Sequence, residues 1–130
     1  MSNQEPSKPY LGLEEHPVKN IMNLFQTGLR EMVSARGLLN TGRRLLGIPE
    51  SGAKVYIIGE KSEILKIEFT EKSVSLLVLY YIPKTHRLDI YDSEGLVAVS
   101  ERKKFLYMRC TEGLKRLGFE GIFKGLISLT

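Results

Sequence analysis

Cysteine is almost absent from this chain of 130 residues, and aspartate is nearly as scarce. The one cysteine, Cys110, excludes a disulfide within the chain and is typical of a reducing compartment. No apolar run approaches the roughly 18–20 residues that cross a bilayer. The first 17 residues hold no apolar segment of the signal-peptide type. We therefore expect a cytoplasmic protein that does not bind membranes.

The residues that usually carry catalysis are also few. The two histidines, His16 and His86, fall in expected loops, and neither has histidine, cysteine or carboxylate neighbours at metal-ligand spacing. Cys110 falls on the apolar side of an expected helix, which predicts a buried thiol rather than a nucleophile. Phosphate-binding glycine loops, dinucleotide fingerprints and zinc-protease motifs are all missing. The sequence therefore predicts a protein that is not an enzyme and that uses no cofactor and no metal.

Positive charge is in excess and unevenly distributed. The net charge is +4 and the isoelectric point is about 9.2. Residues 101–130 hold seven Lys or Arg against three Glu, whereas residues 51–100 are close to neutral. Basic flanks favour anionic partners such as nucleic acid, although the same net charge is also typical of an ordinary soluble domain. The many Glu and Lys beside few Asn and Gln lean toward a thermophile.

The chain divides into a short tail and one domain. Residues 1–12 hold Pro6 and Pro9 among polar residues and predict a flexible tail, which leaves residues 13–130 as a single α+β domain. After Pro17, apolar residues recur with a period of 3.6, which predicts an N-terminal helix. Gly37 and Gly42 leave open whether residues 34–48 form one bent helix or two.

Short apolar segments then predict an antiparallel meander of four to five strands, at residues 54–59, 63–70, 73–82, 87–92 and 96–99. The segment 73–82 is apolar on both faces, so both faces must be covered. The cover is either the protein itself or a second subunit, a nucleic-acid strand or a ligand. Whether Tyr80 or Tyr81 lies on the open face stays undecided, because a slip of one residue exchanges the faces.

Ser100 is a credible N-cap, and the residues from Glu101 to Gly118 predict a C-terminal helix. The apolar tail, residues 119–130, should pack back on the domain. The expected fold class is therefore α+β, with an N-terminal helix, a meander and a C-terminal helix, and with the helices packed on one face of the sheet.

The leading functional hypothesis is non-enzymatic binding of nucleic acid, with single-stranded DNA or RNA favoured over a duplex. On the predicted C-terminal helix, Arg102, Arg109 and Arg116 share one face, where they would neutralise phosphates. Aromatic side chains would stack on bases. The candidate nucleic-acid-binding residues are Arg102, Phe105, Arg109, Arg116, Arg87, Tyr81, Tyr91, Arg43 and Arg44.

An alternative from another class is a protein-interaction module, either a homodimer or a small accessory subunit of a larger assembly. In that hypothesis the apolar strand 73–82 and the apolar tail meet the partner, and the basic residues only keep the protein soluble. A carrier of a small ligand is a third class, but the sequence shows no convergent polar cluster for it.

Overall fold

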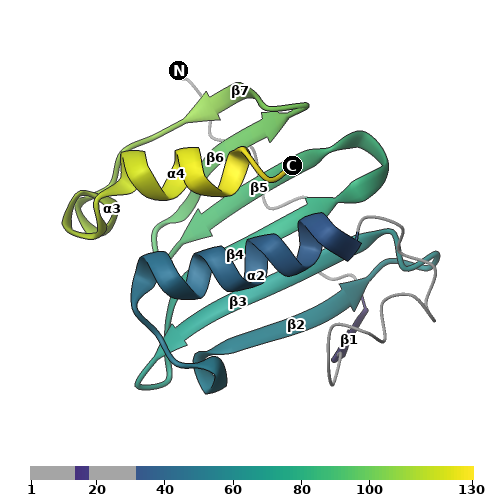
Figure 1. Ribbon diagram of the computed structural model, residues 1–130, viewed down its shortest axis with the longest axis horizontal. Coiled ribbons are helices and arrows are strands. Elements are labelled where there is room, and N and C mark those ends of the chain that lie inside the picture. The colour runs from purple at the N-terminus through teal and green to yellow at the C-terminus, as the bar shows by residue number, and fades with distance from the viewer. Residues whose placement is uncertain (1–13, 18–31) are drawn as a thin grey trace.

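A single antiparallel sheet with helices on one face makes up the part of the chain that the computed structural model describes, residues 14–17 and 32–130 (Figure 1). The prediction of an α+β fold is confirmed. The predicted tail and the first part of the predicted N-terminal helix, residues 18–31, lie outside the described residues.

The sheet has seven strands, which lie in chain order with every neighbouring pair antiparallel. Their bounds are β1 Glu15–Pro17, β2 Ala53–Ile58, β3 Ile64–Glu71, β4 Val74–Ile82, β5 Arg87–Asp92, β6 Gly95–Glu101 and β7 Lys104–Met108. The predicted meander is confirmed, but the predicted count of four to five strands is wrong. The two additional strands, β1 and β7, are the edges of the sheet.

Two of the hairpin loops consist of residue types that are uncommon in tight turns. Lys72 and Ser73 link β3 to β4, and Arg102 and Lys103 link β6 to β7. All four have positive φ, between 51° and 68°. Two-residue hairpin loops with positive φ at both positions are usually Asn-Gly or Asp-Gly, because those residues tolerate the left-handed conformation. The sequence therefore contains no sign of the hairpin between β6 and β7.

Helix α2, Met32–Leu46, is one continuous helix that contains both Gly37 and Gly42. This settles for residues 32–46 the question that the two glycines left open. The helix ends at Gly47, whose φ is 67°. There the amide of Ile48 donates to the carbonyl of Arg43, and that of Gly47 donates to Arg44. This pair of hydrogen bonds is a Schellman motif.

The predicted C-terminal helix is wrong in its first half. Residues 101–108 complete β6 and form β7, and the helix α3, Glu112–Leu117, begins only after Thr111. The Thr111 hydroxyl accepts a hydrogen bond from the amide of Leu114 at 3.2 Å and donates one to the Asp92 carboxylate. Gly118 ends α3 in the left-handed conformation, as predicted.

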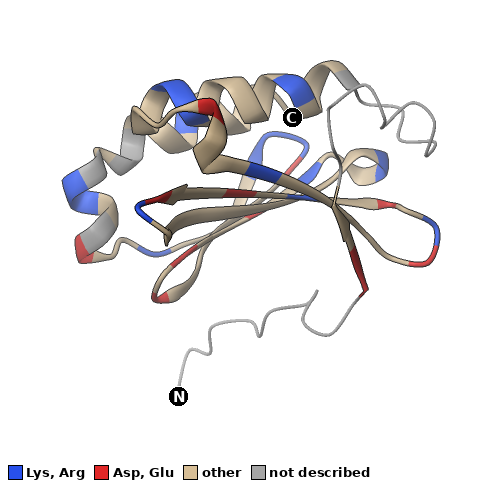
Figure 2. Ribbon diagram, turned by 90° about the horizontal axis from the view of Figure 1, so that it is seen from below, with Lys and Arg blue, Asp and Glu red and all other residues tan. Residues whose placement is uncertain are grey.

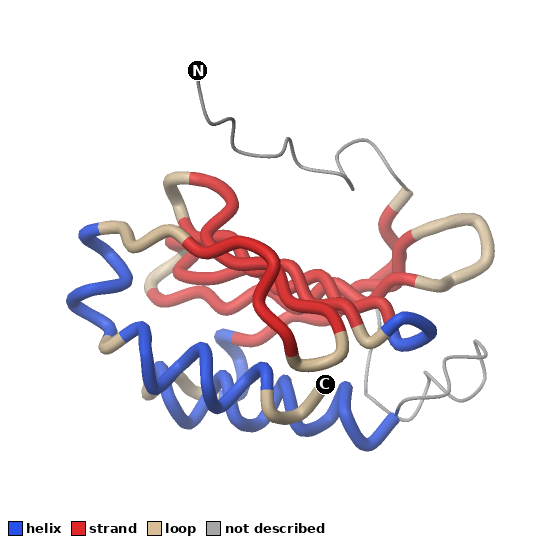
Figure 3. Tube along the Cα trace, turned by 90° about the horizontal axis from the view of Figure 1, so that it is seen from above, coloured by secondary structure: helices blue, strands red, loops and turns tan. Residues whose placement is uncertain are grey.

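The apolar tail forms helix α4, Phe119–Ile127, which packs back on the domain as predicted. Its buried residues are Ile122, Phe123, Leu126 and Ile127. Helices α2 and α4 lie side by side across the same face of the sheet (Figures 1 and 3). The main core fills the space between this helical layer and the sheet.

We call the opposite side of the sheet the open face, because the described part of the chain places no helix there (Figures 2 and 3). Strand β4 contributes to both sides, as its two-faced sequence requires. Leu77, Leu79 and Tyr81 are fully buried on the helical side. Val78 and Tyr80 are half-buried on the open face, in a separate small cluster with Tyr91, Leu96 and Val99.

Candidate interaction surfaces

The predicted row of arginines does not exist, because its three members belong to three different elements. Arg102 lies in the turn between β6 and β7, Arg109 directly follows β7, and Arg116 lies in α3. The guanidinium of Arg109 donates to the backbone carbonyl of Glu94 at 3.1 Å. The heptad spacing carried no geometric meaning here, since the chain is extended rather than helical between Lys104 and Met108.

Arg87 lies on the open face and is held there by a carboxylate. Its Nε is 2.8 Å from Oδ1 of Asp89, and its second nitrogen contact, to Oδ2, is 3.2 Å. Asp89 is completely buried. A buried carboxylate needs a charged or hydrogen-bonding partner, so this guanidinium is committed to neutralising Asp89.

The prediction that Tyr81 is available to stack on a base is wrong, because Tyr81 is fully buried beneath the helical layer. The register places Tyr80 on the open face instead, beside Tyr91. The Tyr80 and Tyr91 rings are 5.3 Å apart at an interplanar angle of 83°, an edge-to-face contact. Tyr91 retains only 2% exposure, so it offers little ring surface to a base.

The remaining candidates lie apart from one another. Arg43 and Arg44 are in the last turn of α2, where basic side chains favour the negative end of the helix dipole. Phe105 lies on β7, opposite Ser100 on β6 and with its ring 6.5 Å from that of Phe123. Figure 2 shows Lys and Arg residues distributed over the helical layer, the turns and the sheet. Apart from Arg43 and Arg44, which are neighbours in the chain, the candidate arginines lie on different elements.

The open face is rich in tyrosine and balanced in charge. Lys66 forms an ion pair with Glu15 of β1 and lies 5.2 Å from the ring centre of Tyr56 and 6.0 Å from that of Tyr80. Burial favours the neutral amine, but the hydrogen bond to Glu15 and the surrounding negative charges outweigh it and raise the pKa of Lys66 above 10.5. Like Arg87, Lys66 is therefore paired with an acid of the same face.

Strand β7 carries three of the five large apolar side chains that are exposed in the described part of the chain. Phe105 is 42% exposed, Leu106 56% and Met108 54%. The two other large apolar side chains that are exposed among the described residues are Val33 and Val74. We call Phe105, Leu106 and Met108 the edge surface, because β7 is the last strand of the sheet. Sequence reasoning missed this surface, since it assigned the segment to a helix.

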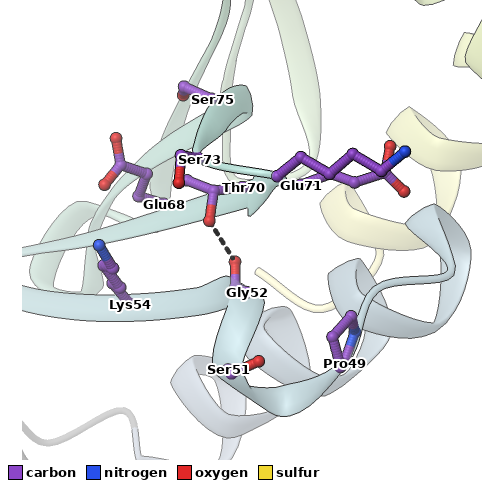
Figure 4. A pocket seen from close by; sticks show the side chains of 10 residues that line it. Pro49, Ser51, Gly52, Lys54, Glu68, Thr70, Glu71, Ser73 and Ser75 are labelled. Carbon is purple, nitrogen blue, oxygen red and sulfur yellow. Dashed lines mark hydrogen bonds between the residues drawn. The ribbon is translucent and has the colours of Figure 1, made fainter.

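A polar hollow of about 630 Å³ lies at one end of β2, β3 and β4 (Figure 4). Its lining residues are Pro49, Ser51, Gly52, Lys54, Glu68, Thr70, Glu71, Lys72, Ser73 and Ser75. The Thr70 hydroxyl donates to the carbonyl of Gly52 at 3.4 Å, and both residues line the hollow. Two cations and two anions balance within this lining, which includes neither histidine nor cysteine, so the hollow offers no pairing of a nucleophile with a histidine base.

The histidines and the cysteine lie outside any catalytic grouping among the described residues. His86 Nδ1 is 3.0 Å from the carbonyl oxygen of Thr130, and His16 is exposed on β1. Cys110 is exposed, so the prediction of a buried thiol is wrong. The physical reason is that Cys110 follows an edge strand instead of lying on a helix stripe.

Comparison with protein-family models, with curated proteins and with solved structures found no match to this chain. Within residues 14–17 and 32–130, no helix combines the length and the apolarity needed to cross a membrane. The same residues bring no three or more histidine, cysteine, aspartate or glutamate side chains together as a metal site.

Proposed function

We propose that this protein is a non-enzymatic protein-interaction module that binds a partner through the edge surface on β7. The observation that carries the proposal is the exposure of Phe105, Leu106 and Met108 on an edge strand that, within the described residues, pairs with β6 alone. Natural proteins usually protect sheet edges, and exposed apolar side chains grouped on one edge strand are typical of an interaction site.

The proposal moves the docking surface away from the segments that the sequence favoured. Strand β4 is the fourth of seven strands and is paired on both sides, and the apolar tail is folded into α4 against the core. Substituting Leu77 or Leu79 with aspartate would place a charge in the core, so loss of binding there would report unfolding. Leu106 is the informative position, because its side chain is exposed.

Charge pairing on the open face disfavours nucleic acid as a ligand of that face. A surface that tracks phosphates needs cations that are free to release counterions. Lys66 and Arg87 are both held by acids on that face. Aromatic side chains and methionine are enriched at protein interfaces, and Phe105 and Met108 supply both at the edge surface.

Site-specific photo-crosslinking tests the proposal. A photoreactive phenylalanine analogue replaces Leu106 in one variant and Val74 in a matched control. Val74 is a suitable control because its side chain is 60% exposed. In an extract of the cells that make the protein, we expect position 106 to give a discrete adduct that nuclease leaves intact and that contains peptides of a second protein. A nuclease-sensitive adduct, or equal labelling at both positions, would contradict the proposal.

Oligonucleotide binding tests the rival hypothesis directly. We expect labelled single-stranded and duplex oligonucleotides to show no tight binding in fluorescence anisotropy at about 50 mM salt. Tight binding that weakens steeply at about 200 mM salt would overturn the proposal in favour of nucleic acid. Arg102, Arg109 and Arg116 would then be the first positions to substitute.

A further inference from the structure

We propose that the partner segment adds to the sheet as a further β-strand along β7, and that this segment is extended, apolar at its centre and acidic at its ends. The inference rests on the proposed function and names the chemistry of the partner at the same surface.

The backbone of β7 supports strand addition. Each residue of an antiparallel strand directs its N–H and C=O groups to one neighbour or the other in alternation. Strand β7 has β6 on one side and is the terminal strand of the sheet on the other. Part of its backbone donors and acceptors therefore face outward, and an extended peptide satisfies such groups by continuing the ladder.

The side chains of β7 define what lies at the centre of the added strand. A register shift between Val99 and Ser100 places Phe105 opposite Ser100 and Tyr107 opposite Val99. Phe105 therefore lies on the helical side, near Phe123, and Tyr107 on the open face. An added strand meets apolar side chains on both faces, which favours apolar residues at successive positions in its centre.

The charge of the edge defines the ends of the added strand. The segment from Arg102 to Arg109 contains four cations and no anion. The cations flank the edge surface, with Arg102, Lys103 and Lys104 before it and Arg109 after it. Acidic residues at both ends of an extended partner complement this arrangement, because opposite charges on adjacent strands attract.

The same charges argue against a second copy of this chain as the occupant. An antiparallel self-pairing centred on Leu106 would place Lys103 opposite Arg109 at both ends. Like charges directly opposite one another on adjacent strands are destabilising.

Synthetic peptides and isotope-labelled protein provide the test. The probe peptide has a Val-Leu-Ile-Leu-Val centre between Glu-Asp ends. One control carries Lys-Arg ends, and a second keeps the acidic ends but has proline in the centre, which removes a donor. We expect the probe to change the NMR chemical shifts of the amides of residues 104–109 and to slow their hydrogen exchange. Both control peptides should bind at least about fivefold more weakly.

A charge-matched pair of variants locates the site. Leu106→Asp is expected to weaken binding of the probe at least about fivefold, whereas Val74→Asp, which adds the same charge at another exposed position, leaves it unchanged. Far-ultraviolet circular dichroism of both variants checks that the sheet is intact.

Three results would overturn the inference: shifts that map away from β7, equal binding of the basic-ended peptide, or a dimer of the chain joined through β7. If the probe does not bind but position 106 still gives the photo-crosslinked protein adduct, strand addition is rejected and the proposed function stands. If neither probe binding nor the adduct is observed, the proposed function is rejected as well.

Discussion

Glycine at position 42 is required by a single contact between a helix and the sheet. A Cβ on Gly42 would lie 2.2 Å from the Phe69 ring, which is fully buried in the core. A Cβ on Gly37 in the same helix would meet Leu129 at 3.4 Å, an ordinary contact distance. The two glycines look alike in the sequence, yet only Gly42 permits a close approach.

At the residue scale, we expect Gly42→Ala to lower the free energy of unfolding by about 1–3 kcal/mol, because the ring of Phe69 must move in a packed core. The control Gly37→Ala is expected to be neutral or to stabilise by up to about 1 kcal/mol through helix propensity. Urea denaturation of the two variants measures both. Equal stability of the two variants would show that Gly42 is not a packing glycine.

At the scale of the element, turns and caps decide where each strand and helix ends. The hairpin between β3 and β4 holds Lys72 and Ser73 at φ of 51° and 66°. The hairpin between β6 and β7 does the same with Arg102 and Lys103. Neither pair includes the glycine or asparagine that such turns favour, so the sheet pairing on both sides imposes the conformation.

We expect the double substitution Lys72→Asn and Ser73→Gly to raise the free energy of unfolding by about 1–2 kcal/mol, because it relieves the left-handed strain. A Lys72→Ala and Ser73→Ala variant retains the strain and controls for the lost side chains. Thermal denaturation measures the difference. A stability gain in the alanine variant equal to that of the Asn-Gly variant would assign the effect to side chains.

The cap of α3 is a second test at this scale. Thr111 is buried, accepts from the amide of Leu114 and donates to Asp92. Thr111→Ala is expected to lower the free energy of unfolding by about 1–2 kcal/mol, whereas Thr111→Ser keeps the hydroxyl and most of the stability. Chemical denaturation separates the two, and equal losses would implicate the methyl group instead of the cap.

At the scale of the whole molecule, the open face couples β1, β3 and β4 through charge. The ion pair between Lys66 and Glu15 joins β3 to the edge strand β1 across β2. Burial raises the pKa of Tyr80 above 10.0, and the environment of Lys66 raises its pKa above 10.5. Both groups therefore hold their protons more strongly in the folded protein than in the unfolded chain.

This coupling predicts a loss of stability at alkaline pH. Groups with a raised folded pKa contribute stability that is fully present below their unfolded pKa values of 10.0 and 10.5 and is lost as the pH rises through the folded values. Urea denaturation between about pH 8 and 11 should show the decline. Glu15→Gln should make it shallower, since it removes the negative charge of Glu15, which helps to raise the pKa values of Lys66 and Tyr80. A decline of the same steepness in that variant would exclude the ion pair as a cause.

Local patterns in the sequence determined the strands β2 to β6, the cap at Gly118 and the return of the apolar tail, because each depends on neighbouring residues. The alternation of apolar residues and short connections is enough for an antiparallel meander. Only the tertiary structure decided that residues 101–108 belong to the sheet. Ser100 is a good N-cap and the following residues tolerate a helix, so the choice depended on pairing with β6, to which no local pattern points.

Pairing between distant segments also explains why the predicted site differs from the surface that the fold exposes. The three arginines shared a face only if the segment was helical, and Tyr80 replaced Tyr81 on the open face because the register was set by pairing along the whole sheet. Composition determined the charge and the scarcity of catalytic residues. The exposure of Phe105, Leu106 and Met108 arose only when β7 became the last strand, since a sheet edge is a property of the assembled fold and of no single segment.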